Sequence, residues 1–204
     1  MRSGLLTRMR RWFPDLAPAV ETARRPVVRG LAAIGARPNH ITVLGALIAV
    51  ASGYLASQGA LLPAGLIFLL GSLLDGLDGA LARHTDSVSS TGAFLDSVLD
   101  RVGEAALLVG LTLHFTREDD TLGIAATAAA LALSMLVSYA RARAESLSLN
   151  RGGFIAAPRP VRVALLVIGL IVGQPRAAVM AVVLLAAVSV IQRVAAGMRG
   201  GNNE

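Results

Sequence analysis

Six apolar segments follow one another between residues 41 and 196, and most of them approach the length of a membrane span. They are Ile41–Ser57, Leu62–Ala82, Gly92–Phe115, Leu122–Ala142, Val161–Gly173 and Ala177–Ala196. A helix needs about 20 apolar residues to cross a bilayer. Only 16% of the residues are charged, whereas a soluble domain is about one quarter charged. We therefore predict an all-α integral membrane protein with six transmembrane helices.

The region before the first apolar segment is basic and carries apolar residues at spacings of three and four. These residues are Leu16, Val20, Ala23, Val27, Leu31 and Ile34. The spacing favours an amphipathic helix at the membrane interface, with an ordinary surface helix as the alternative. The predicted organisation is a basic segment with this helix over residues 1–37, a six-helix domain over 38–198 and a tail over 199–204.

The arginines predict the orientation of the chain. Eight arginines precede Ile41, and others gather after the fourth apolar segment and at the C-terminal end. Because positive residues are enriched in cytoplasmic loops, we expect both termini and the loop between the second and third segments to be cytoplasmic. The net charge of +6 accompanies only 4% aromatic residues, which favours anionic lipid or phosphorylated substrates over nucleic acid. Cysteine is absent, which excludes a thiolate metal site.

Four aspartates lie in or beside apolar segments, where ionisable groups are costly. Asp75 and Asp78 are three residues apart, and Asp96 and Asp100 are four apart. On a helix each spacing places both side chains on one face, and a hairpin would bring the two pairs together. The carboxylates could share protons, pair with arginines or bind divalent cations. Oxygen ligands favour a hard cation such as Mg²⁺, Mn²⁺ or Ca²⁺, and two such ions would suit a pyrophosphate substrate.

Two other interpretations of the aspartates remain open, namely a structural ion-pair cluster and a proton relay in a small transporter. A non-catalytic membrane scaffold is a further alternative. Glu104 follows Asp100 by one helical turn, and it either orients a ligand or pairs with Arg101. The role of His84, next to Arg83, stays open.

The spacing of these residues resembles the signature of the CDP-alcohol phosphatidyltransferase family. The matching pattern is Asp75-x2-Asp78-Gly79-x2-Ala82-Arg83-x8-Gly92-x3-Asp96-x3-Asp100. The resemblance implies transfer of the phosphatidyl group of CDP-diacylglycerol to an alcohol with release of CMP, in the cell membrane with a cytoplasmic active site. It also implies a homodimer and a role in phospholipid biosynthesis.

The same resemblance implies roles for individual residues. Asp75, Asp78, Asp96 and Asp100 are implied metal ligands, and Asp96 and Asp100 are implied catalytic residues, with Asp100 the general base. The implied nucleotide and pyrophosphate pocket comprises Asn39, Asp78, Gly79, Ala82, Arg83 and Gly92.

The acceptor alcohol is read from a second set of residues, which resembles that of phosphatidylinositol phosphate synthases in this family. The resemblance implies that the acceptor phosphate is bound by Arg141, Arg159, Arg162 and Arg193. The stretch Gly152–Ile155 belongs to the same resemblance. Inositol phosphate is the favoured acceptor, and glycerol 3-phosphate is the alternative because an arginine cluster suits either phosphate.

Overall fold

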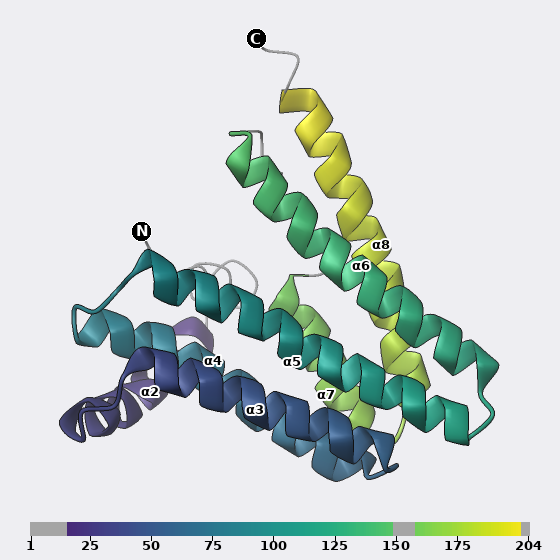
Figure 1. The fold of residues 1–204 in the computed structure, drawn as a ribbon, viewed down its shortest axis with the longest axis horizontal. Coiled ribbons are helices and arrows are strands. Elements are labelled where there is room, and N and C mark those ends of the chain that lie inside the picture. The colour runs from purple at the N-terminus through teal and green to yellow at the C-terminus, as the bar shows by residue number, and fades with distance from the viewer. Residues whose placement is uncertain (1–15, 149–157, 201–204) are drawn as a thin grey trace. The chain divides into compact units, whose positions relative to one another are not determined.

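The computed structural model describes residues 16–148 and 158–200, which form seven helices and no strand. In chain order the helices are α2 (Leu16–Ala33), α3 (Pro38–Ser57), α4 (Leu61–His84), α5 (Ser90–Arg117), α6 (Thr121–Ser146), α7 (Arg159–Ile171) and α8 (Pro175–Gly200) (Figure 1). The predicted all-α class is confirmed. Gly152–Ile155, the N-terminal basic residues and the end of the C-terminal tail lie outside the described residues.

Four of the seven helices are long and apolar enough to cross a bilayer, which indicates a multi-pass membrane protein. They are Pro38–Ser57, Leu61–His84, Thr121–Ser146 and the Pro175–Met198 part of α8. Helix α5 carries four charged residues between Asp96 and Glu104. Helix α7 has 13 residues and is therefore about 20 Å long, shorter than a hydrocarbon core of about 30 Å. The count of six spans therefore stays a prediction, as does the interfacial position of α2.

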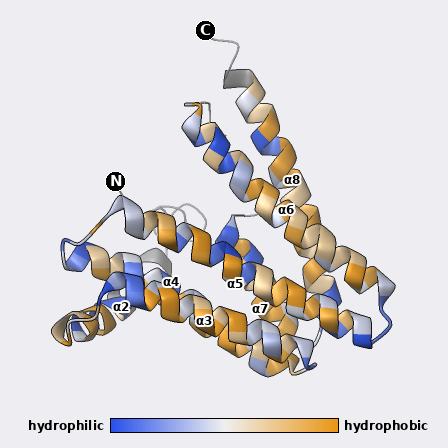
Figure 2. Cartoon of the chain, viewed as in Figure 1, coloured by the Kyte–Doolittle hydropathy of each residue, from blue (hydrophilic) through white to orange (hydrophobic). Residues whose placement is uncertain are grey.

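Large apolar side chains point outward from the long helices. Tyr54 on α3, Leu184 on α8 and Ile191 on α8 are each about two thirds exposed. The helices are correspondingly apolar along most of their length (Figure 2). Extended apolar surface of this kind is unusual in soluble monomers and is typical of surface that faces lipid or a partner.

Tight turns at glycine join two pairs of consecutive helices. Gly59 lies between α3 and α4 with φ +79°, and Gly173 lies between α7 and α8 with φ +69°. Glycine adopts this left-handed region without the steric cost that other residues incur. The connections are accordingly short, spanning residues 58–60 and 172–174.

The chain divides into two compact units, which share helices α3, α4 and α5. Unit 1 consists of the described residues of Met1–Ile48 and Leu70–Val102. Its core contains Val28 of α2, Ile41 of α3, and Ala80 and Leu81 of α4. These contacts pack the end of α2 against the start of α3 and the end of α4, next to the segment of α4 that carries Asp75 and Asp78.

Unit 2 consists of the described residues of Ala49–Leu69 and Gly103–Glu204. Its core draws apolar side chains from every helix in the unit, including Phe68, Leu107, Leu108, Leu111, Phe115, Leu166, Leu170, Val179 and Val182. Helix α8 packs along α6 and against α7 (Figure 1). The second half of α5 is therefore enclosed, with Leu107, Leu108 and Leu111 fully buried.

Within unit 2, the backbones of α3 and α5 touch at a pair of glycines. A Cβ atom at Gly110 would overlap the carbonyl group of Gly53, and one at Gly53 would overlap the carbonyl group of Ala106. Small residues allow membrane helices to approach this closely. The contact therefore depends on glycine at both positions.

Gly110→Ala is expected to destabilise the protein, because the added methyl group meets backbone atoms that have no side-chain freedom to move. Overpacking of this kind typically costs about 1–3 kcal/mol. The matched control is Gly197→Ala in α8, where the methyl group would meet nothing within 4 Å. Thermal unfolding of the purified proteins in detergent should show a lower melting temperature for Gly110→Ala only. Equal melting temperatures for the two variants would contradict the close packing.

Candidate active site

Three of the four predicted metal ligands lie together in unit 1. One carboxylate oxygen from each of Asp75, Asp78 and Asp96 lies within 4.8 Å of the other two. Asp75 and Asp78 come from α4 and Asp96 comes from α5, so the cluster joins two consecutive helices. Asp100 is half-buried one turn after Asp96 and lies outside the group of three at this distance.

The geometry of the three carboxylates fits a divalent cation. Oxygen ligands lie about 2.1 Å from Mg²⁺, so two ligands on opposite sides of the ion are about 4.2 Å apart. The cluster needs little contraction to reach this arrangement. Three carboxylates at such separations repel one another, and a hard cation would remove this repulsion with the ligand type that it prefers.

Asp78 is held in place by hydrogen bonds from two donors. The Thr42 hydroxyl of α3 lies 2.5 Å from its Oδ2 atom, and the Gly79 backbone N–H donates to Oδ1 over 2.5 Å. Asp78 is 5% exposed, so these bonds satisfy a carboxylate that has little access to water. Sequence reasoning assigned no role to Thr42, although the residue follows Asn39 closely in the chain.

The structure brings several of the predicted nucleotide-pocket residues into contact. A Cβ atom at Gly92 would lie 3.2 Å from Oδ1 of Asn39, so α3 and the start of α5 meet at this glycine. A Cβ atom at Gly79 would lie 3.4 Å from a guanidinium nitrogen of Arg83. Ala82, which lies between Gly79 and Arg83 in the sequence, is half-buried.

A basic cavity of about 320 Å³ lies in unit 1 beside the end of α4. Its lining includes Arg83 and His84 from α4 and Arg24, Arg25 and Arg29 from α2. Among its lining residues there is no carboxylate. An anionic group is therefore the ligand that this cavity favours.

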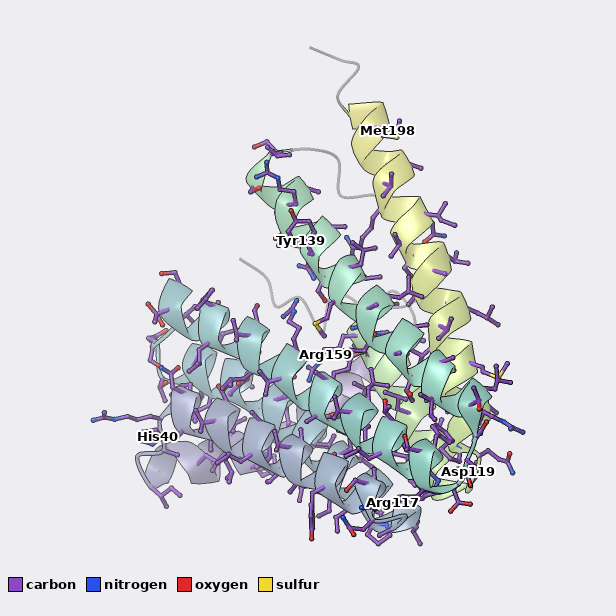
Figure 3. The ribbon with its side chains drawn as sticks, turned by 45° about the vertical axis from the view of Figure 1, so that its right-hand side comes forward. His40, Arg117, Asp119, Tyr139, Arg159 and Met198 are labelled. Atoms are coloured by element: carbon purple, nitrogen blue, oxygen red, sulfur yellow. The ribbon has the colours of Figure 1, made fainter. Side chains whose placement is uncertain are left out.

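The predicted acceptor-phosphate residues lie in unit 2, on α6, α7 and α8. Arg193 is close enough to Arg141 and Arg162 for electrostatic interaction, and its Nε atom is buried without a hydrogen-bond acceptor among the described residues. Figure 3 shows Arg159 on α7, together with Tyr139 on α6 and Met198 on α8. Arginines gathered in this way repel one another, so an anion among them would be stabilised.

Two glutamates pair with arginines of this group. Glu145 accepts from Nε of Arg141 over 3.0 Å at a partly exposed position. Glu104 binds Arg162 through both carboxylate oxygens, at 2.7 and 2.8 Å. The suggested pairing of Glu104 with Arg101 is wrong, because the Arg101 guanidinium donates to the carbonyl oxygen of Ser97. The sequence signal for the Arg162 pair was weak, since the partners are 58 residues apart.

Comparison with known proteins connects these groups to one family. The profile of the CDP-alcohol phosphatidyltransferase family matches residues 36–192. An archaetidylinositol phosphate synthase of Pyrococcus horikoshii is 34% identical over 179 residues, which cover 88% of this chain and 93% of that protein. A phosphatidylinositol phosphate synthase of Mycobacterium marinum is 35% identical over 174 residues, covering 81% and 74% of the two chains.

Two crystal structures of a Mycobacterium tuberculosis phosphatidylinositol phosphate synthase share the fold. The structure with CDP-DAG bound has a TM-score of 0.76 and 30% identity, and covers 84% of this chain and 91% of that chain. The structure in complex with manganese and citrate has a TM-score of 0.78 and 29% identity, and covers 85% and 88%. The chain therefore belongs to the CDP-alcohol phosphatidyltransferase family.

Proposed function

We propose that the protein transfers the phosphatidyl group of CDP-diacylglycerol to inositol phosphate and releases CMP, as a step of phospholipid biosynthesis. The observation that carries this proposal is the gathering of Asp75, Asp78 and Asp96 around one point, at the family spacing. A relative with CDP-DAG bound and relatives named as inositol phosphate lipid synthases support the choice of substrates.

The proposed reaction gives the four aspartates two tasks, which are proton transfer and metal binding. The acceptor hydroxyl oxygen attacks the phosphorus that carries the diacylglycerol group, and the bond from this phosphorus to the bridging oxygen breaks. CMP leaves with the electron pair of that bond, and Asp100 takes the proton of the hydroxyl. Asp75, Asp78, Asp96 and Asp100 would hold Mg²⁺ or Mn²⁺, with two ions the proposed number. When bound, the cations would neutralise the pyrophosphate and stabilise the charge on the leaving CMP.

The nucleotide and pyrophosphate are proposed to lie against Asn39, Asp78, Gly79, Ala82, Arg83 and Gly92. The closeness of Gly92 at the start of α5 to Asn39 on α3 supports this assignment. In addition, glycine leaves room for a ligand to approach the backbone. Arg83 also lines the basic cavity, where an anionic group would be favoured.

The arginines of unit 2 suit a phosphorylated acceptor. Glu145 pairs with Arg141 and Glu104 pairs with Arg162. The four guanidinium groups of Arg141, Arg159, Arg162 and Arg193 carry two more charges than these two carboxylates. A phosphate monoester carries a charge of about −1.5 to −2 at pH 7. The charge of the group therefore complements one acceptor phosphate, and it fits glycerol 3-phosphate as well as inositol phosphate.

The finer membrane arrangement is part of the same proposal. Helices α3 to α8 provide six spans, α2 lies at the interface, and both termini and the active site face the cytoplasm. The lipid chains of the substrate then stay in the bilayer while its headgroup reaches polar residues. The functional form is proposed to be a homodimer.

Asp96→Asn and Asp100→Asn are expected to lower CMP release by at least about 100-fold, because each removes a charge that acts in the transfer step. The matched control is Asp86→Asn, which makes the same change at an exposed position with φ +50° that asparagine tolerates. Activity is measured on purified protein with radiolabelled CDP-diacylglycerol, and folding is followed by thermal unfolding. Near-normal CMP release from folded Asp96→Asn or Asp100→Asn protein would overturn the catalytic assignment.

Removal of divalent cations is expected to abolish transfer. After treatment with EDTA and gel filtration, the wild-type protein should release no CMP, because the charge of the pyrophosphate is then not neutralised. Addition of Mg²⁺ or Mn²⁺ should restore CMP release. Zn²⁺-free buffers serve as a control for contaminating metal. Full activity after chelation would contradict a metal-dependent reaction.

A panel of acceptors separates the competing functions. Wild-type protein should form lipid product with inositol phosphate, whereas product with glycerol 3-phosphate alone would change the acceptor and leave the reaction class intact. A vesicle uptake assay is run beside it. Uptake without CMP release would favour a transporter with a carboxylate relay, and neither activity would favour a non-catalytic scaffold.

A further inference from the structure

The buried ion pair between Glu104 and Arg162 is not used by the transfer chemistry. Nε and Nη2 of Arg162 donate to Oε1 and Oε2 of Glu104 over 2.7 and 2.8 Å. The two side chains are 3% and 1% exposed, and the pair joins the second half of α5 to the first turns of α7. The positive charge of Arg162 and the negative charge of Glu104 are therefore both buried in unit 2.

Other side chains surround the Glu104 carboxylate. Arg159 is near enough to interact with it electrostatically. Leu107 and Leu108 of α5 and Leu166 of α7 belong to the apolar core around the pair. Glu104 thus connects α5 and α7 from within an apolar region.

The energetics of such a pair argue against a purely stabilising role. Removing two charges from water costs free energy that their mutual attraction offsets only partly, so a buried ion pair is weak support for stability. A bidentate arginine–carboxylate contact instead fixes the geometry of its partners. The question is then which residue near Arg162 needs a fixed orientation.

Helix α7 supplies the answer, because Arg159 begins the same helix that Arg162 joins to Glu104. It has 13 residues, and its N-cap Pro158 makes no side-chain capping bond. Arg159 and Arg162 are three residues apart, so they lie on one face of the helix. Holding Arg162 against Glu104 therefore also sets the direction in which Arg159 projects.

We propose that Glu104 is a positioning residue of the acceptor site, which binds Arg162 as an internal anchor so that Arg159 is oriented toward the acceptor phosphate. This inference rests on the proposed function of unit 2 as the site for a phosphorylated alcohol. It changes the role of Arg162 from a phosphate ligand to a support for Arg159. Arg141 and Arg193 remain the other proposed phosphate ligands.

Glu104→Gln tests the proposal because it keeps the shape of the side chain and removes its charge. The KM for the acceptor should rise about tenfold, while the KM for CDP-diacylglycerol and kcat change less than about twofold. If Arg162 were itself a phosphate ligand, losing Glu104 would release its guanidinium and leave the acceptor KM equal or lower. An unchanged or lower acceptor KM in folded Glu104→Gln protein would therefore overturn the proposal.

A double-mutant cycle identifies the residue through which Glu104 acts. Combined with Arg159→Ala, Glu104→Gln should add almost nothing to the rise in acceptor KM, because both changes remove the same interaction. The matched cycle uses Arg143→Ala on the exposed face of α6, where the two effects should be independent. Additive effects in the cycle with Arg159 would contradict the positioning role.

A second variant covers the case in which Glu104→Gln does not fold. Glu104→Gln combined with Arg162→Met removes both charges and is expected to fold, because an uncompensated buried charge is avoided. Its acceptor KM should still be raised, and a wild-type value in the folded double variant would overturn the proposal. The wild-type acceptor panel is completed first. If only glycerol 3-phosphate gives product, the inositol phosphate proposal fails, and the Glu104 comparison is made with that acceptor.

Discussion

Charged side chains inside apolar helices need compensation, and this requirement shapes both units of the protein. Water cannot solvate an ionisable group there, so the charge must meet a counter-charge, hydrogen-bond donors or a metal ion. Asp78 receives hydrogen bonds from Thr42 and from its own helix. Glu104 receives two hydrogen bonds and a counter-charge from Arg162. Each compensation joins two helices, so the polar contacts also determine how the apolar helices pack.

The two units use different forms of compensation, which suits two different ligands. In unit 1, the carboxylates of Asp75, Asp78 and Asp96 gather at one place, where a cation would balance their charge. In unit 2, arginines outnumber their glutamate partners, and the excess positive charge would be balanced by a phosphate. The proposed reaction moves a phosphatidyl group from a pyrophosphate to the hydroxyl of a phosphorylated alcohol, and it would use one group of each kind. The chain belongs to the CDP-alcohol phosphatidyltransferase family, and the proposed reaction is a phosphatidyl transfer.

Local spacing explains which features could be predicted from the sequence. The helices and the convergence of the aspartates follow from apolar segment length and from carboxylates three and four residues apart, and both are properties of neighbouring residues. The partner of Glu104 is 58 residues away on α7, and nothing in the local pattern distinguishes Arg162 from Arg101. Thr42 was missed for the same reason, because its partner Asp78 is 36 residues further along the chain. Contacts between distant helices depend on packing, which periodicity alone does not specify.

The central claim is that the aspartates of unit 1 form a binding site for divalent metal, and Mn²⁺ binding tests it without reference to catalysis. Electron paramagnetic resonance of free Mn²⁺ is recorded while purified wild-type protein is titrated, with Asp75→Asn and Asp96→Asn measured in parallel. The account predicts that the wild-type protein removes about two Mn²⁺ ions per chain from solution and that both variants bind fewer. Equal Mn²⁺ binding by the wild-type protein and the two variants, or no binding by any of them, would contradict it.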